Sequence, residues 1–455
     1  MKHIYKIIII AFIFFASCFG VFKLMQNNEI YQHTLGKISS NYISNGDERY
    51  NAKISYLEIT NENILHWDVV WYHNISKYGY VLKQWEHSEA FFPLFPFIWH
   101  LTTLSPVGIC CLNFLMFCIG LIIFASIFKM NKIFYFIFSL PMIVIFIIPY
   151  TEATFFLCGS LVIYGFLKNH YWLYFIAMIL LAMTRNSFAL ILPALFATEI
   201  LFLIQHHNFL LSLKRFTFSS LPLIIGTVLV SIIQLLYGSK SFFGFTHAQS
   251  YWRHYLSFPD LRNINDWSHE SFGMNLPTLI LCLMLIFYLI VVLLYHFKIL
   301  KYKSVSLFNL NSGNKQDYLL VVSIFCCIAA FLGVMFFQHG CLNGLSRYVL
   351  ATPYFFIFLI LSNKKYINIT PKYRLTGFLI FIFSILFLFY IISYGNFGFA
   401  YLGGLILLLF MGLWLFADFY QHWLYKTIIC INFTINVIWT TYMFNILLSN
   451  GWIFT

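Results

Sequence analysis

The chain has 455 residues, of which 61% are hydrophobic and only 9% are charged, and its formal net charge is +12. A soluble protein carries about 25% charged residues, so this composition excludes a soluble globular domain, a disordered chain and, despite the positive charge, a nucleic-acid-binding protein. Apolar runs of about 20 residues predict instead an all-α polytopic membrane protein, with residues 1–455 forming a single integral membrane domain.

The first apolar run covers residues 4–24. We expect it to be retained as the first span, because it is long for the apolar region of a signal peptide. A cleaved signal peptide is an alternative. A lipoprotein-type cleavage site at Phe15-Ala16-Ser17-Cys18 is another.

A polar stretch at residues 26–90 follows and is predicted to be the first non-cytoplasmic loop. It contains Trp67-Asp68, followed by Tyr72 and Tyr80. Aromatic faces stack on the C–H surfaces of sugars, and a carboxylate can accept the proton of a sugar hydroxyl. The pattern therefore favours a sugar site in this loop. The alternative is a solvated carboxylate beside interfacial aromatic residues.

The rest of the chain alternates between apolar runs and short polar loops. A proline-broken segment at 91–97 opens this part, and two longer loops lie at 238–276 and 296–317. Together with the first run, the apolar runs predict about 11–13 spans. They lie near 107–128, 133–149, 153–167, 171–183, 187–204, 217–237, 277–297, 318–338, 348–362, 374–394, 399–417 and 427–448.

The basic residues predict the topology, because Lys and Arg concentrate in cytoplasmic loops. With the N-terminus in the cytoplasm, nearly all short basic loops fall on that side. Their basic residues are Lys2, Lys6, Lys129, Lys132, Lys168, Lys214, Arg215, Lys298, Lys301, Lys303, Lys315, Lys364, Lys365, Lys372, Arg374 and Lys426. The opposite, non-cytoplasmic side then receives the first loop and the second loop, at 238–276. It also receives the turns that contain Glu152, Arg185 and Arg347.

Those three turns carry charges close to the hydrocarbon. Placing a carboxylate such as Glu152 close to hydrocarbon costs free energy, so we expect Glu152 to have either a function or an ion-pair partner. Arg185 is the candidate partner. A structural ion pair is the alternative. Arg347 precedes an apolar run and is a candidate phosphate ligand, because a guanidinium matches phosphate oxygens. Its alternative role is an arginine that extends to the membrane interface.

Signatures of other chemistry are absent from the sequence. There is no His, Cys and carboxylate cluster with metal-ligand spacing, no glycine-rich phosphate loop and no Ser-His-Asp signature. We therefore name no metal-ligating residues and expect no cofactor, while a requirement for a metal ion stays open.

Taken together, these motifs resemble the PIG-V family, the second mannosyltransferase of GPI-anchor synthesis with its bacterial relatives. The matching segments follow the family order and are Trp67-Asp68, Tyr72, Ile75, Gly79-Tyr80, residues 90–96, residues 149–153, residues 184–187 and residues 346–353. Three positions depart from the family pattern. His66 replaces an arginine, Ser76 replaces an alanine, and Asn186-Ser187 inverts the family's Ser-Asn order.

The resemblance implies a GT-C-class enzyme that uses a polyprenyl or dolichyl phosphate sugar as donor. Asp68 is then the catalytic base, while Trp67, Tyr72 and Tyr80 shape the sugar pocket. Glu152, Arg185 and Arg347 are the remaining donor-binding candidates, and the segment 91–97 seats the loop against the bilayer. The acceptor is a glycan, a glycolipid or a protein.

Two other functions stay open at this point. One is a lipid or glycan transporter or flippase. The other is a non-catalytic membrane scaffold that binds lipid or a small membrane partner subunit. The resemblance predicts the cytoplasmic membrane of a bacterium or the endoplasmic reticulum membrane of a eukaryote as the location.

Overall fold

The computed structural model describes residues 2–34, 56–80, 87–128, 132–239, 241–251, 254–260, 262–263, 272–297, 299, 310, 313–366, 369–393, 400–451 and 453. Over these ranges the chain is helical and contains no strand, which confirms the predicted all-α fold. Much of the three predicted loops lies outside the described residues, as do Lys129, Lys298, Lys301 and Lys303.

The helices of the first half begin with the long α1, and the short helices α2 and α4 follow it before the predicted site at Asp68. They are α1 (Lys2–Met25), α2 (Asn28–His33), α4 (Asn61–Ile64), α5 (Asp68–Tyr78), η2 (Ser88–Ala90), α6 (Leu94–Thr102), α7 (Pro106–Phe128), η3 (Lys132–Tyr135), η4 (Ile137–Ser139), η5 (Ile143–Phe146), α8 (Glu152–Lys168), α9 (Tyr171–Ala182) and α10 (Phe188–His206). The second half contains α11 (Phe209–Leu236), α12 (Gly244–Tyr251), α13 (Phe272–His296), α14 (Lys315–Phe337), α15 (Leu345–Leu350), α16 (Pro353–Tyr366), α17 (Pro371–Ser393), α18 (Ala400–Leu415), η7 (Ala417–Phe419) and α19 (Trp423–Leu448).

Eight helices in the described part of the chain are long and apolar enough to cross a membrane: α1, α7, α10, α11, α13, α14, α17 and α19. The protein is therefore a multi-pass membrane protein. Other predicted spans form the shorter helices α8, α9, α16 and α18, of 17, 12, 14 and 16 residues. A helix of 17 residues reaches only about 26 Å, slightly less than the hydrocarbon thickness.

Residues 133–149 do not form the predicted span. They fold into the short helices η3, η4 and η5, and their apolar side chains are buried by the surrounding helices. Irregular backbone at membrane depth requires internal hydrogen-bond partners. Two asparagines of α19 provide them. Asn432 donates to the carbonyl of Ser139, and Asn436 donates to the carbonyls of Phe138 and Leu140.

The variant Asn436→Leu tests this support. It leaves two buried carbonyls without their side-chain donor, so we expect a loss of about 1–3 kcal/mol in the free energy of unfolding. Thermal unfolding in detergent measures the loss. Thr434→Ala is the control, because Thr434 is an exposed residue of the same helix and bonds only within it. Equal stability of the two variants would contradict the assigned role of Asn436.

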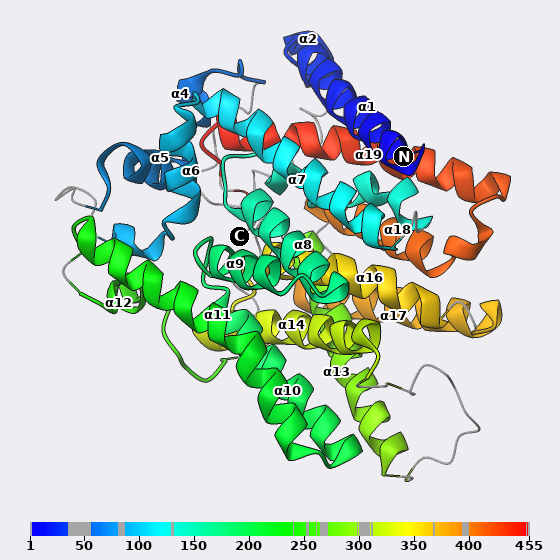
Figure 1. The fold of residues 1–455 in the computed structure, drawn as a ribbon. Helices are drawn as coiled ribbons and strands as arrows, with labels where there is room; N and C mark the ends of the chain where they lie inside the picture. Colours follow the sequence, from blue (N-terminus) through cyan, green and yellow to red (C-terminus); the bar gives the residue numbers. More distant parts are fainter. Residues whose placement is uncertain are drawn as a thin grey trace.

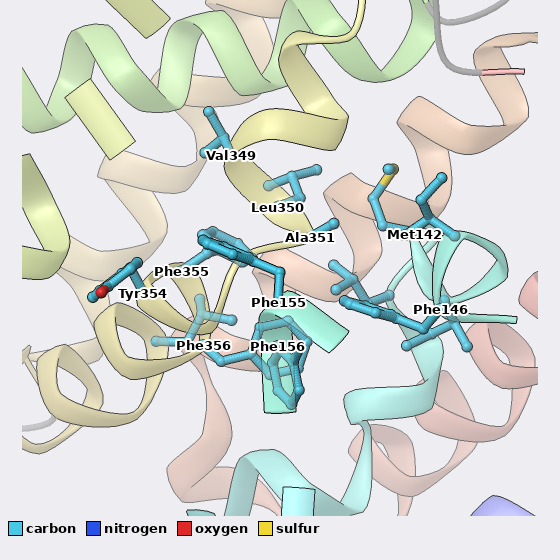
Figure 2. Packing of buried hydrophobic residues seen from close by; sticks show 14 of the residues in the cluster. Met142, Phe146, Phe155, Phe156, Val349, Leu350, Ala351, Tyr354, Phe355 and Phe356 are labelled. Carbon is cyan, nitrogen blue, oxygen red and sulfur yellow. The ribbon is translucent and has the colours of Figure 1, made fainter. Parts of the chain in front are cut away.

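An aromatic core joins η5, α7, α8 and α16. The rings of Phe117 and Phe146 stack at 4.2 Å, and Phe156 lies 4.7 Å from Phe356. Figure 2 shows Phe155 and Phe156 together with Phe146 and Phe356 in this core. Helices α8 and α16 approach closely because Gly159 faces Pro353, where a Cβ atom would overlap the proline ring. This core fixes the starts of α8 and α16.

The two ends of the bundle differ in their charged residues. Figure 1 shows α4, α5, α6 and α12 gathered on one side of the molecule. The far ends of α8 and α16 carry lysines, and α14 and α17 begin at that end. There Lys365 pairs with Asp317 at 2.9 Å, and the buried Arg374 pairs with Asp418 at 2.7 Å.

Candidate functional site

Four charged residues from distant parts of the sequence meet near the start of α8. Arg347 lies at the centre: its Nε is 2.5 Å from Oε1 of Glu152, and its Nη1 is 3.3 Å from Oδ2 of Asp68. Arg185 Nη1 lies 3.2 Å from the same Glu152 oxygen, which confirms the predicted Glu152–Arg185 pair. We call Asp68, Glu152, Arg185 and Arg347 the charged cluster.

Asp68 is the first residue of α5 and is aimed at the cluster by its neighbours. Trp67 precedes it with φ of 52°, a conformation that costs a non-glycine residue about 1–3 kcal/mol. The indole N–H of Trp67 donates to the carbonyl of Asn450 at 3.1 Å. One turn into α5, the buried Tyr72 packs edge-on against Phe91 and Phe95. These contacts hold the start of α5 against the bundle.

Glu152 is the first residue of α8, and its side chain is fully buried. A carboxylate at a helix N-terminus is stabilised by the helix dipole. The approach to this position is fixed by Asn113 of α7, which donates to the carbonyls of Ile148 and Tyr150. The position of Glu152 therefore depends on a polar side chain within a membrane-spanning helix.

The two arginines lie on short turns with local hydrogen bonds. Arg185 follows α9, where the hydroxyls of Thr184 and Ser187 both donate to the carbonyl of Leu181. Arg347 lies in α15, and the backbone N–H of its neighbour Ser346 donates to Asn275 at 2.9 Å. The guanidinium of Arg347 is directed to two carboxylates of the protein.

Aromatic rings support both guanidinium groups. Arg347 lies over the ring of Tyr150 at 4.6 Å, and Arg185 lies over the ring of Tyr348 at 4.8 Å, both within the range of cation–π attraction. Neither tyrosine was predicted from the sequence to have a role. Asn113 and Asn275 are further site residues without a predicted role, although a polar residue within an apolar run is a recognisable signal.

Tyr80 lies apart from the charged cluster. Its hydroxyl donates to the carbonyl of Phe91 at 2.8 Å, and its backbone N–H donates to the carbonyl of Tyr237 at 2.9 Å. Among the described residues, no hydrogen bond or ring contact joins Tyr80 to the cluster. Most of the segment 91–97 also packs inside the protein; Phe92 and Phe95 are buried, and Phe97 is exposed.

The two carboxylates have different acidities. Burial raises the pKa of Asp68 above the ordinary aspartate value, and the attraction of Arg347 offsets only part of that effect. Burial also acts to raise the pKa of Glu152, but Arg347 and Arg185 together hold it below the ordinary glutamate value. Glu152, held by both arginines, is thus the more acidic carboxylate, and Asp68 is the more basic one.

The arginines keep hydrogen-bonding capacity that the protein does not use. Within the described ranges, Nη2 of Arg347 and both Nε and Nη2 of Arg185 have no hydrogen-bond acceptor. One of the two Glu152 oxygens, Oε2, is likewise buried without a donor there. A guanidinium that is held by one edge and open at another is suited to binding an anion.

Comparisons with family models, with curated protein sequences and with solved structures find no match to this chain. No group of three or more metal-ligating side chains occurs in the part of the chain that was described. The chemical role of the charged cluster therefore has to be argued from its geometry and from the sequence motifs.

Proposed function

We propose that this protein is an inverting membrane glycosyltransferase. It moves a mannosyl, or another hexosyl or pentosyl, group from a polyprenyl or dolichyl phosphate sugar to a glycan, glycolipid or envelope acceptor. The observation that carries the proposal is the contact of Asp68 with Arg347. A partly exposed, basic carboxylate there adjoins an arginine with unused donors, which is the pairing that sugar transfer from a phosphate requires.

The proposed reaction uses each member of the cluster in a distinct way. Asp68 accepts the proton of the acceptor hydroxyl as that oxygen attacks the anomeric carbon. The bond between the anomeric carbon and the phosphate oxygen breaks, and the lipid phosphate leaves with the electron pair. Free N–H groups of Arg347 and Arg185 stabilise the growing negative charge. Glu152 holds both arginines in place, while Trp67 and Tyr72 shape the sugar pocket.

A transfer assay tests the proposal. Purified protein in proteoliposomes is supplied with membrane acceptors and with radiolabelled polyprenyl phosphate sugars, one at a time. We expect label to move into an acceptor from one donor. A flippase would move the intact donor lipid across the bilayer, and a scaffold would leave it unchanged. Either outcome, without chemical transfer from any donor, would contradict the proposal.

Arg347 is expected to act on the donor phosphate. Arg347→Ala should lower donor-dependent turnover by about 10²–10³-fold, and Arg347→Lys should lower it less, because an ammonium lacks the guanidinium fork. The apparent affinity for the acceptor should change little. Arg374→Lys is the matched control, since Arg374 is a buried, carboxylate-paired arginine at the opposite end of the bundle. Wild-type kinetics for Arg347→Lys would assign Arg347 a structural role.

The proposal also requires the charged cluster to face the non-cytoplasmic side. Single cysteines at Glu62 of α4 and at Trp172 of α9 report the two sides, and both positions are exposed. The background lacks the accessible cysteines Cys111, Cys118, Cys341 and Cys430. In intact cells, an impermeant maleimide should label the Glu62→Cys variant and should label Trp172→Cys only after permeabilisation. The reverse pattern would refute this orientation.

A further inference from the structure

The second predicted loop presents large apolar side chains that nothing in the described structure covers. Phe258 is 92% exposed, Leu256 is 71% exposed and Phe243 is 69% exposed. The described residues 241–251 and 254–260, here called the aromatic segment, also expose Tyr251 and Tyr255. Apolar side chains gathered in this way mark an interaction surface.

The aromatic segment is attached to the end of a membrane-spanning helix. The backbone N–H of Ser257 donates to the carbonyl of Phe336 at 2.9 Å, in the last turn of α14. The ring of Phe258 lies 6.3 Å from that of Phe336, and the N–H of Asp260 donates to the carbonyl of His339. The segment therefore lies at the depth at which α14 ends.

The exposed apolar surface continues from the segment onto its neighbouring spans. Leu236 and Tyr237, at the end of α11, are 76% and 59% exposed, and Phe337 at the end of α14 is 43% exposed. Both α11 and α14 are long and apolar enough to span the membrane. Exposed apolar side chains therefore occur both in the aromatic segment and at the ends of two neighbouring membrane-spanning helices.

The charge of the segment fits the same location. Residues 241–260 contain only two charged residues among Asp, Glu, Lys and Arg, namely Arg253 and Asp260. Asp260 pairs with Arg262 at 2.7 Å. Aromatic side chains with few charges are typical of the belt where proteins cross from hydrocarbon to water. A segment that faced bulk water or a polar protein surface would carry more charged side chains than this one.

We propose that the aromatic segment lies in the membrane–water interface, on the side of the membrane that contains the charged cluster. Its partner is the lipid surface, and Phe243, Leu256 and Phe258 insert between lipid headgroups. Residues 238–276 were predicted to form a non-cytoplasmic loop, and part of that loop would then lie in the bilayer surface. It does not depend on the proposed enzymatic activity.

The attachment links this segment to the turn that leads to Arg347. Gly340 has φ of 93°, and a Cβ atom there would overlap the backbone of Asp260. Only glycine fits this contact without displacing one of the two segments. The aromatic segment, itself bound to lipid, thereby supports the start of the connection between α14 and α15.

Spin labelling in lipid nanodiscs tests the location. Labels are attached to Leu256→Cys and Phe258→Cys in full-length protein from which the accessible cysteines Cys111, Cys118, Cys341 and Cys430 have been removed. Two reference sites calibrate the measurement. Phe383→Cys represents lipid, because Phe383 lies on the membrane-spanning helix α17 and is 70% exposed, and Glu62→Cys represents water. Collision rates with oxygen and with a water-soluble nickel chelate are measured at each site.

We expect the ratio of oxygen to nickel collisions at both test sites to be several-fold higher than at Glu62→Cys and to approach the lipid reference. A ratio equal to that of Glu62→Cys would place the segment in water and overturn the proposal. Exclusion of both reagents would indicate a protein partner and would overturn it as well. The double variant Leu256→Asp/Phe258→Asp, labelled at Phe243→Cys, should shift the ratio at that site toward the water value. An unchanged ratio would also count against the proposal.

Discussion

Asp68→Asn is expected to lower sugar transfer by about 10²–10⁴-fold, because an amide cannot accept the proton of the attacking hydroxyl. The variant keeps the size and hydrogen-bonding shape of the side chain, so expression and thermal stability should stay close to those of the unmodified protein. Initial rates with the donor identified in the transfer assay measure the effect.

Asp418→Asn is the control for the loss of an ion pair as such. Asp418 also pairs with a buried arginine and has a side-chain exposure of 26%, against 21% for Asp68, but it lies at the other end of the bundle. We expect this control to retain transfer. Equal losses in the two variants would mean that pairing, and not proton acceptance, explains the effect at Asp68.

The acidity of Asp68 gives the same assignment a second test. Because burial raises its pKa, the carboxylate becomes protonated, and inactive as a base, at a higher pH than an ordinary aspartate. The acid limb of kcat/KM against pH should therefore lie above the value for a solvent-exposed aspartate. An acid limb at the pKa of a solvent-exposed aspartate would contradict the expected effect of burial on Asp68.

Glu152→Leu should have the largest effect on stability. The change leaves Arg347 with only Asp68 and leaves Arg185 without a carboxylate, and removing one partner of a buried pair costs about 3–5 kcal/mol. Because the pKa of Glu152 is depressed, its contribution is complete above the pKa of an unfolded glutamate. It is lost as the pH falls through the lower folded value.

Thermal unfolding in detergent, across pH, measures that loss. The exposed Glu62 supplies the control Glu62→Leu, for which we expect little change. The double variant Glu152→Leu/Arg185→Leu should recover part of the lost stability, since it also removes the uncompensated charge of Arg185. Wild-type stability of Glu152→Leu would contradict the anchoring role.

Sequence patterns predicted the fold class and the charged residues, but not how those residues meet. Glu152 and Arg185 were paired correctly because Glu152 begins α8 and Arg185 follows the next helix, α9, so that both were expected near the same membrane face. The central position of Arg347 depends on contacts with residues up to 279 positions away, which no local pattern encodes. Tyr80 was placed in the sugar pocket from its motif alone, whereas its hydroxyl bonds to Phe91.

The segment 133–149 shows why hydropathy misleads here. A run of apolar side chains predicts a span because it records which residues avoid water. It does not record whether their backbone forms a continuous helix. In this protein several carbonyl groups of the segment find donors on α19 and α7, at Asn432, Asn436 and Asn113, so a continuous helix is not required.

That arrangement has a consequence for biosynthesis. The donor for the carbonyl of Phe138 lies 298 residues further along the chain, so at about 5–20 residues per second the ribosome needs roughly 15–60 s to deliver it. During this interval the early helices lie in the membrane next to the irregular segment 133–149, some of whose carbonyl groups still lack their hydrogen-bond donors. The newly made protein would then depend on the insertion machinery or on nearby lipid headgroups to provide hydrogen-bond donors for these carbonyl groups. A chain released before α19 would be a substrate for quality-control proteases.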